Sequence, residues 1–196
     1  MHGLVNKSIE SFVTDTYGPD LWRHVCDDLG TPGLSFEPLL HYDDTQTHGL
    51  IASVAASLGK PHQEVLEDVG TYLVSHQNTQ AIRRLLRFCG ATFYDFVLSL
   101  DTLRDRARLA VDDLDLPRLD VASMNEGTII LKVQPIWSGF SDVLVGLIRA
   151  MADDYGALVF IQRDFVPQGW DRIEVILIQH DFGSGNSFDL SVSATS

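Results

Sequence analysis

One arginine lies where a permanently charged side chain is not expected. In the stretch 93–111, apolar residues recur at three- and four-residue spacing, which is typical of one face of an amphipathic helix; they are Phe93, Phe96, Val97, Leu100, Leu103, Ala107 and Val111. Arg104 falls near the centre of that face. A guanidinium stays charged in proteins, so its burial requires a carboxylate, a bound anion or a path to water. An anionic ligand or an internal ion pair would meet that need, and internal pairing is the commoner solution.

Other residues that could do chemistry form weaker patterns. His41, Asp43, Asp44 and His48 could in principle collect a metal ion, but they span an expected strand-to-helix junction, and we interpret them as a solvated turn. The segment 183–187 is glycine-rich, but no helix follows it, so it does not predict a phosphate-binding loop. No nucleophile elbow and no His/Cys cluster with metal-ligand spacing is present. The sequence therefore predicts a protein that is not an enzyme and has no metal site.

Composition narrows the class of protein. The 196 residues include 14 basic and 27 acidic side chains, a formal net charge of −13, which disfavours nucleic acids and anionic membrane surfaces as partners. Cys26 and Cys89 are too few for a disulfide framework. No apolar run approaches the roughly 18–20 residues of a membrane span, and the N-terminus lacks the plan of a signal peptide. We expect a soluble, cytoplasmic protein with no membrane insertion.

The apolar pattern of the first 115 residues predicts helices. Gly59 is suited to end one of them, and Pro19 and Pro61 are suited to begin two others. The apolar periodicity predicts helices over 1–13, 19–29, 45–58, 61–76, 81–88 and 93–109.

The remaining chain changes to strand-like patterns. Residues 128–134, 157–164 and 171–179 read as strands, and 140–152 as a helix, which gives the order β-α-β-β. This order favours an α+β fold in which the last two strands form an antiparallel hairpin. We expect one domain over 1–182, with a helical lobe over 1–116, a sheet lobe over 117–182 and a flexible tail over 183–196. Pro117 marks the boundary between the lobes.

Several short motifs occur in a characteristic order. They are Met1, Gly3, Val5, Asn6, Ile9 and Glu10 at the start; Tyr17-Gly18-Pro19 and Trp22; Tyr42-Asp43-Asp44; Gly70; Leu100-Asp-Thr-Leu103; and Asp142-Val-Leu-Val-Gly-Leu-Ile148. Together they span most of the chain, and their order resembles that of heme-nitric-oxide/oxygen-binding (H-NOX) domains. The resemblance implies a helical lobe and a mixed sheet lobe, with a cavity of tetrapyrrole size between them.

Two functional motifs of that family are missing. In the family, a histidine that ligates heme iron follows Leu-Asp-x-Leu, but here Arg104 takes its position and a guanidinium cannot ligate iron. The family's Tyr-x-Ser-x-Arg motif, which binds the heme propionates, falls on Val133, Pro135 and Trp137. The resemblance therefore implies heme for the family, while these four residues predict that heme is absent here.

The resemblance also points to further positions, each with a plainer alternative. Pro117 matches the proline that presses on the porphyrin, or it is a turn at the lobe boundary. Leu73 and Val145 match the distal wall of the heme pocket, or they are ordinary core residues. His76 is the best candidate for a substitute iron ligand, although a core histidine is the commoner reading. His2 is a weaker candidate, as is Cys89, which lies beside the arginines at 83, 84 and 87.

The function expected from this resemblance is a heme-free sensor or regulatory domain that acts through protein contacts, with Trp137 filling the emptied cavity. Family members pass signals to cyclases, kinases or diguanylate-turnover proteins, and a homo- or heterodimer fits such a role. Two alternatives stay open: a fatty acid or another tetrapyrrole bound with Arg104 as counter-charge, and a heme-binding sensor of nitric oxide or oxygen that uses His76.

Overall fold

The structure, a computed structural model, describes residues 1–125, 127–134, 136–166 and 169–186. Pro135 and residues 187–196 of the predicted tail therefore lie outside the described residues. The helices are α1 (Gly3–Tyr17), α2 (Pro19–Asp28), α3 (Asp44–Leu58), α4 (His62–Ser75), α5 (Gln80–Arg87), α6 (Phe93–Leu98), α7 (Leu103–Ala110) and α8 (Phe140–Tyr155), with single turns of 3-10 helix at η1 (Gln77–Thr79) and η2 (Ser99–Thr102).

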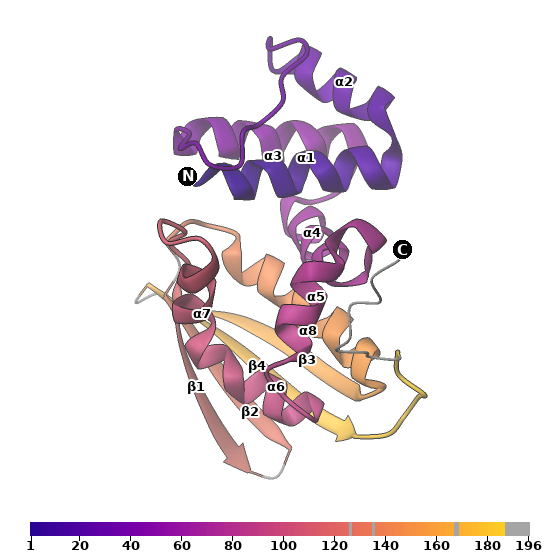
Figure 1. Cartoon of the computed structure of the whole chain (residues 1–196), viewed down its shortest axis with the longest axis vertical. Coiled ribbons are helices and arrows are strands. Elements are labelled where there is room, and N and C mark those ends of the chain that lie inside the picture. The colour runs from indigo at the N-terminus through magenta and orange to yellow at the C-terminus, as the bar shows by residue number, and fades with distance from the viewer. Residues whose placement is uncertain (126, 135, 167–168, 187–196) are drawn as a thin grey trace, which may run out of the picture.

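The predicted helix ends are largely confirmed. Pro19 occupies the first turn of α2, where a missing N–H costs nothing. Gly59 ends α3 in the left-handed conformation, with φ of 63°, and Pro61 immediately precedes α4. Figure 1 shows α1, α2 and α3 together at one end of the molecule, with the sheet at the other end.

The prediction of one continuous helix over 93–109 is wrong. The chain forms α6, then η2, then α7, because side chains compete for the backbone carbonyl of Ser99. The hydroxyl of Thr102 donates to that carbonyl at 2.9 Å and the guanidinium of Arg106 donates to it at 2.8 Å. The apolar periodicity continues through the break, so the sequence pattern gives no warning. Phe93, Phe96, Val97 and Leu100 are buried, but none of the residues of α7 is.

The sheet has one strand more than predicted. Strands β1 (Arg118–Asn125), β2 (Thr128–Gln134), β3 (Leu158–Val166) and β4 (Trp170–Gln179) are antiparallel in the order β1-β2-β4-β3. The hairpin of β3 and β4 is confirmed, as is the α+β fold class, but the order β-α-β-β becomes β-β-α-β-β. The sequence pattern missed β1 because it is an edge strand in which only Leu119 is buried, so the alternation that signals a strand is weak.

One face of this sheet carries the core of the lobe. Ile129, Leu131 and Val133 of β2 and Ile173 and Val175 of β4 share that face and pack against α6 and α8. A second hydrophobic cluster fills the space among α1, α2, α3 and α4.

Helix α8 links the two clusters because it crosses α4 at very close range. A methyl group added to Gly146 would lie 1.9 Å from the carbonyl oxygen of Glu67, so only glycine fits at the crossing. The sheet lobe is thus held directly against α4.

Two peripheral features complete the fold. None of the helices in the described ranges combines the length and apolar character that a bilayer-crossing helix requires. The described start of the predicted tail, residues 183–186, is tied to the end of α8, because the Asn186 N–H donates to the carbonyl of Asp154 at 2.9 Å.

Candidate functional site

Arg104, which the sequence motifs predict to match the family's iron ligand, lies in the first turn of α7 and forms an internal ion pair. Its Nη2 donates to Oδ1 of Asp115 at 2.6 Å, and Nη2 of Arg108 donates to the same oxygen at 2.7 Å. The Arg104 side chain is 35% exposed, and Asp115 is 52% exposed. The Nε of Arg104 is buried and has no hydrogen-bond partner within the described part of the chain. Arg104 therefore has a carboxylate partner within the protein, and of the two interpretations of its sequence position, an internal ion pair or a bound anion, this corresponds to the ion pair.

A third arginine of α7 has a different role that sequence reasoning missed. Arg106 turns its guanidinium back toward η2 and donates to the carbonyl of Ser99 at 2.8 Å. Burial lowers the pKa of this guanidinium, although it remains a cation at any physiological pH. The alternating arginines at 104, 106 and 108, which are followed by the acidic run 112–115, were the signal that could have revealed this cluster.

The positions that match the family's propionate motif fall into separate cores. Val133 is 0% exposed and belongs to the sheet-lobe cluster, where it lies opposite Leu119 on β1. Trp137 is 9% exposed but belongs to the helical cluster, and its ring meets that of Phe140 edge-on with centroids 6.5 Å apart. Pro135, between them, lies outside the described residues. The two described side chains therefore face different interiors, and Val133 offers no donor for a carboxylate while Trp137 offers only its indole N–H.

The residues that match the walls of the family's heme pocket are packed into the same interiors. Val145 is 4% exposed in the sheet-lobe cluster, and Leu73 is half-buried against the helical cluster. Pro117 is buried and immediately precedes β1. A surface cleft of about 290 Å³ lies elsewhere, and none of these positions lines it; its walls are Asp153, Gly156, Ala157 and residues 182–186.

His76 ends α4 and is held by local contacts. Its ring stacks on Tyr72 with centroids 4.9 Å apart, and its Nδ1 accepts a hydrogen bond from the N–H of Asn78 at 3.2 Å. Asp15 lies 3.6 Å from the same nitrogen and accepts from the Tyr72 hydroxyl at 2.6 Å. Burial, followed by this bond to Asp15, raises the pKa of the Tyr72 hydroxyl above its ordinary value. His76 therefore has a backbone partner and a stacked ring, the contacts expected of a core histidine.

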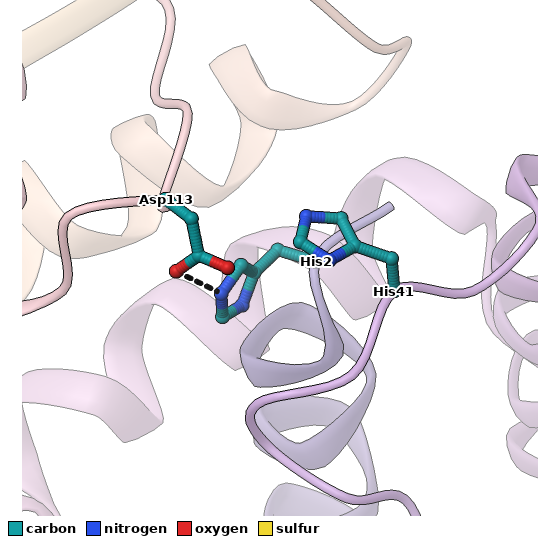
Figure 2. Close-up of side chains that lie close together, drawn as sticks. All are labelled: His2, His41 and Asp113. Atoms are coloured by element: carbon teal, nitrogen blue, oxygen red, sulfur yellow. Dashed lines mark hydrogen bonds and ion pairs between the residues drawn. The ribbon is translucent and has the colours of Figure 1, made fainter.

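The acidic and histidine-rich segment 41–48 does not gather into one site. Asp43 caps α3 by accepting from the N–H of Thr45 at 2.8 Å, and Asp44 accepts from the amino group of Met1 at 2.7 Å. His41 turns instead toward His2, with ring centroids 5.1 Å apart, and Nε2 of His2 lies 3.2 Å from Oδ1 of Asp113 (Figure 2). The structure thus brings together three potential ligands that the sequence did not place near one another. Cys89, the other candidate iron ligand, donates to the carbonyl of Leu85 and is distant in sequence from His2, His41 and Asp113.

Known proteins share both the sequence pattern and the fold of this chain. Soluble guanylate cyclase 89Db of Drosophila melanogaster is 22% identical over 158 residues, which cover 81% of this chain and 24% of that protein. Soluble guanylate cyclase gcy-35 of Caenorhabditis elegans is 29% identical over 160 residues, which cover 78% of this chain and 22% of that protein. The chain thus spans about a quarter of the length of these curated relatives.

Solved structures show the same fold at low sequence identity. A Cs H-NOX mutant that contains 4-cyano-L-phenylalanine superposes with a TM-score of 0.76 at 18% identity, covering 93% of this chain and 100% of that one. An oxygen-binding H-NOX domain related to soluble guanylate cyclases superposes with a TM-score of 0.71 at 18% identity, covering 95% and 100%. The family model described as Haem-NO-binding matches residues 2–163, most of the chain. The chain therefore belongs to the Haem-NO-binding family, as its sequence motifs indicated.

Proposed function

We propose that this chain is a non-catalytic H-NOX regulatory domain that does not bind heme in the manner of its family and that signals through protein contacts. The observation that carries the proposal is the ion pair of Arg104 with Asp115 at the position of the family's iron ligand. A guanidinium offers five N–H donors and no lone pair for iron, so the residue cannot replace an imidazole. Its carboxylate partner also gives it a stable place outside any iron coordination sphere.

The packing around the matching wall positions supports the same proposal. Val145, which matches the distal wall, is 4% exposed, and Val133, which falls on the propionate motif, is 0% exposed. Side chains that line a cavity as large as a tetrapyrrole would be reachable by water, whereas these are covered by protein atoms over almost all of their surface. A porphyrin would therefore have to displace packed core residues in order to enter.

The relatives suggest what such a domain regulates. They are soluble guanylate cyclases, and the chain corresponds to about a quarter of their length. We propose a cytosolic role in which the domain, as a homo- or heterodimer, contacts a cyclase or, failing that, a kinase or a diguanylate-turnover protein. Co-sedimentation of the purified chain with candidate effector domains would test this, and a chain that sediments as a free monomer beside each of them would argue against it.

A hemin titration tests the loss of heme binding. The wild-type chain and Arg104→His, which restores the family's ligand type, are each titrated with hemin while the Soret region of the absorption spectrum is recorded. We expect no sharp Soret band with a stoichiometric endpoint from either protein, because the wall positions are filled as well as the ligand position changed. A stoichiometric band from Arg104→His alone would show that the packing argument is wrong, and a band from wild type that disappears in His76→Ala would establish the substitute-ligand alternative.

One observation favours a second candidate function. The Nε of Arg104 is buried without a partner in the described ranges, and a single carboxylate serves both Arg104 and Arg108. A buried donor and an excess of positive charge suit the carboxylate of a fatty acid or of another tetrapyrrole. Fatty acid is titrated into the wild-type chain, Arg104→Met and the matched control Arg108→Met. Weaker binding in Arg104→Met alone would support a fatty-acid ligand. Equal binding in all three proteins would show that Arg104 does not recognise the fatty acid.

A further inference from the structure

We propose that His2, His41 and Asp113 form a binding site for a divalent transition-metal ion, with zinc the best match. The side chains come from three segments that are far apart in the sequence: the start of α1, the segment that leads into α3, and the connection from α7 to β1. The ligand atoms of all three residues lie within 4.8 Å of one another. Figure 2 shows the three side chains converging on one place.

The distances suit coordination by one ion. Two atoms bound to a tetrahedral zinc at about 2.0–2.1 Å lie about 3.3 Å apart. Nε2 of His2 and Oδ1 of Asp113 are already 3.2 Å apart. The ring of His41 is the more distant member, and it is exposed, so rotation about its side-chain bonds closes the remaining gap without any change in the core.

The backbone fixes two of the ligands before any ion arrives. His2 and His41 face each other in an antiparallel β-bridge. Hydrogen bonds flank the bridge on both sides: the N–H of Gly3 donates to the carbonyl of Leu40 at 2.7 Å, and the N–H of Tyr42 donates to the carbonyl of Met1 at 2.8 Å. Such preorganisation reduces the ordering cost of binding.

The types of ligand select the class of ion. Two imidazoles and one carboxylate are a common protein ligand set for zinc, and they also suit cobalt, nickel and copper in the divalent state. Calcium and magnesium prefer oxygen ligands only. His2 is buried, while His41 and Asp113 are exposed, so the ion has an open path to the site and a fourth position is left for water.

Coordination requires one proton to move on His2. Nδ1 of His2 now accepts from the N–H of Leu4 at 3.1 Å, which places the ring proton on Nε2, where it is directed at Asp113. When Nε2 binds the metal ion, that proton leaves and Nδ1 takes one up, so the neutral imidazole keeps its charge. The N–H of Leu4 would then face another N–H instead of an acceptor, so the imidazole ring has to turn away from Leu4 as the ion binds, and this cost is small beside metal coordination.

The bound ion would connect three segments of the molecule that are far apart in the sequence. Asp113 lies on the connection between α7 and β1, close in sequence to Asp115, which pairs with Arg104. A metal ion at the three ligands would therefore fix the N-terminal helices against the segment that leads into the sheet. The site requires neither heme nor Arg104, so its test is independent of the proposed function.

The experiment uses the full chain, stripped of metal and carrying no polyhistidine tag. Zinc is titrated in competition with a chromophoric chelator, and cobalt is titrated while its visible absorption bands are recorded. We expect one ion per chain, a tetrahedral cobalt spectrum and a melting temperature that rises when zinc is added. His41→Ala and Asp113→Asn should each weaken zinc binding at least tenfold and remove the rise in melting temperature.

The controls are matched to the ligands by type and exposure. His62→Ala removes an exposed histidine from another helix, and Asp112→Asn removes the exposed aspartate next to Asp113; neither should alter zinc affinity. The exposed ligands are chosen in preference to His2 because their loss leaves the cap of α1 intact. The proposal is overturned if no stoichiometric binding occurs, or if zinc binds equally well to wild type, His41→Ala and Asp113→Asn.

Discussion

Two ion pairs of this molecule involve one arginine and one aspartate each, but their surroundings differ. Arg104 and Asp115 meet at α7 with 35% and 52% of their side chains exposed. Arg163 of β3 and Asp142 in the first turn of α8 meet with 25% and 9% exposed. The first pair lies at a partly hydrated edge, whereas the second lies on the helix that carries the buried Val145.

The difference shows how the chain accommodates a charged pair in two kinds of surroundings. At the hydrated edge, water and Asp115 satisfy most of the charge of Arg104. Beside Val145, the Asp142 side chain is only 9% exposed, and Arg163 and the N-terminal end of α8 compensate for its buried charge. Changes on the α8 side should therefore be far more disruptive than changes on the Arg104 side.

Removal of Arg163 should have the largest effect. Arg163→Met leaves the Asp142 carboxylate buried without its cation, which should lower the free energy of unfolding by about 3 kcal/mol. Urea denaturation would measure this loss. Arg172→Met is the matched control, since its acidic partners Asp164 and Glu174 are more exposed, and it should cost less than about 1 kcal/mol. Equal losses in the two variants would contradict the contrast between the pairs.

The same variant predicts a pH dependence. Burial raises the pKa of Asp142 above its ordinary value, against the opposing effect of Arg163, and the nearby Glu67 and Asp171 raise it further. A raised pKa means that the folded state holds the proton more tightly than the unfolded state, so stability is complete below the ordinary carboxyl pKa and falls as pH rises through the folded value. Without Arg163, the pKa of Asp142 in the folded protein should be raised further. The difference in stability between wild type and Arg163→Met should therefore be small at acidic pH and should widen as pH rises, and a constant difference would count against this account.

Restoring the family's tyrosine at the wall should have an intermediate effect. Val133→Tyr forces a ring into a position with no exposed surface, and overpacking of this kind should cost about 2 kcal/mol. The companion substitution Arg104→His restores the family's residue at the hydrated edge and should change stability by less than about 1 kcal/mol. Thermal or urea unfolding of the two variants gives the comparison directly. A Val133→Tyr protein as stable as wild type would reveal space beside the sheet and would reopen the question of a ligand cavity.

The smallest effect is expected for the exposed pair itself. A double-mutant cycle with Arg104→Met and Asp115→Asn should give a coupling energy between about 0 and 1 kcal/mol, which added salt reduces, because both partners are well hydrated. Asp112→Asn serves as the control for loss of a neighbouring negative charge. A coupling energy of several kcal/mol that does not respond to salt would show that Arg104 is far less hydrated than its exposure indicates.

Local sequence rules were sufficient for most of the helical framework. Gly59 ends α3 in a left-handed conformation that glycine favours, and Pro19 suits the first turn of α2, where its missing N–H costs nothing, so both signals can be read from single positions. The local rules were insufficient where side-chain hydrogen bonds or strand pairing decide the structure against the apolar pattern. The break at η2 is caused by Thr102 and Arg106, which take the carbonyl that a continuous helix would use, and β1 forms because β2 offers it a partner, despite its weak apolar alternation.

The candidate sites show the same difference between what the sequence determines and what the tertiary structure determines. The sequence by itself determined that Arg104 cannot ligate iron and that Val133 cannot donate a hydrogen bond to a carboxylate, because a guanidinium has no lone pair and a valine side chain has no donor, whatever the fold. Only the tertiary structure decided that Arg104 pairs with Asp115 and that His2 meets Asp113, which is 111 residues away. Residue chemistry is local and can be read from the chain, whereas the partner of a charge or the third ligand of an ion depends on which segments the packed core brings into contact.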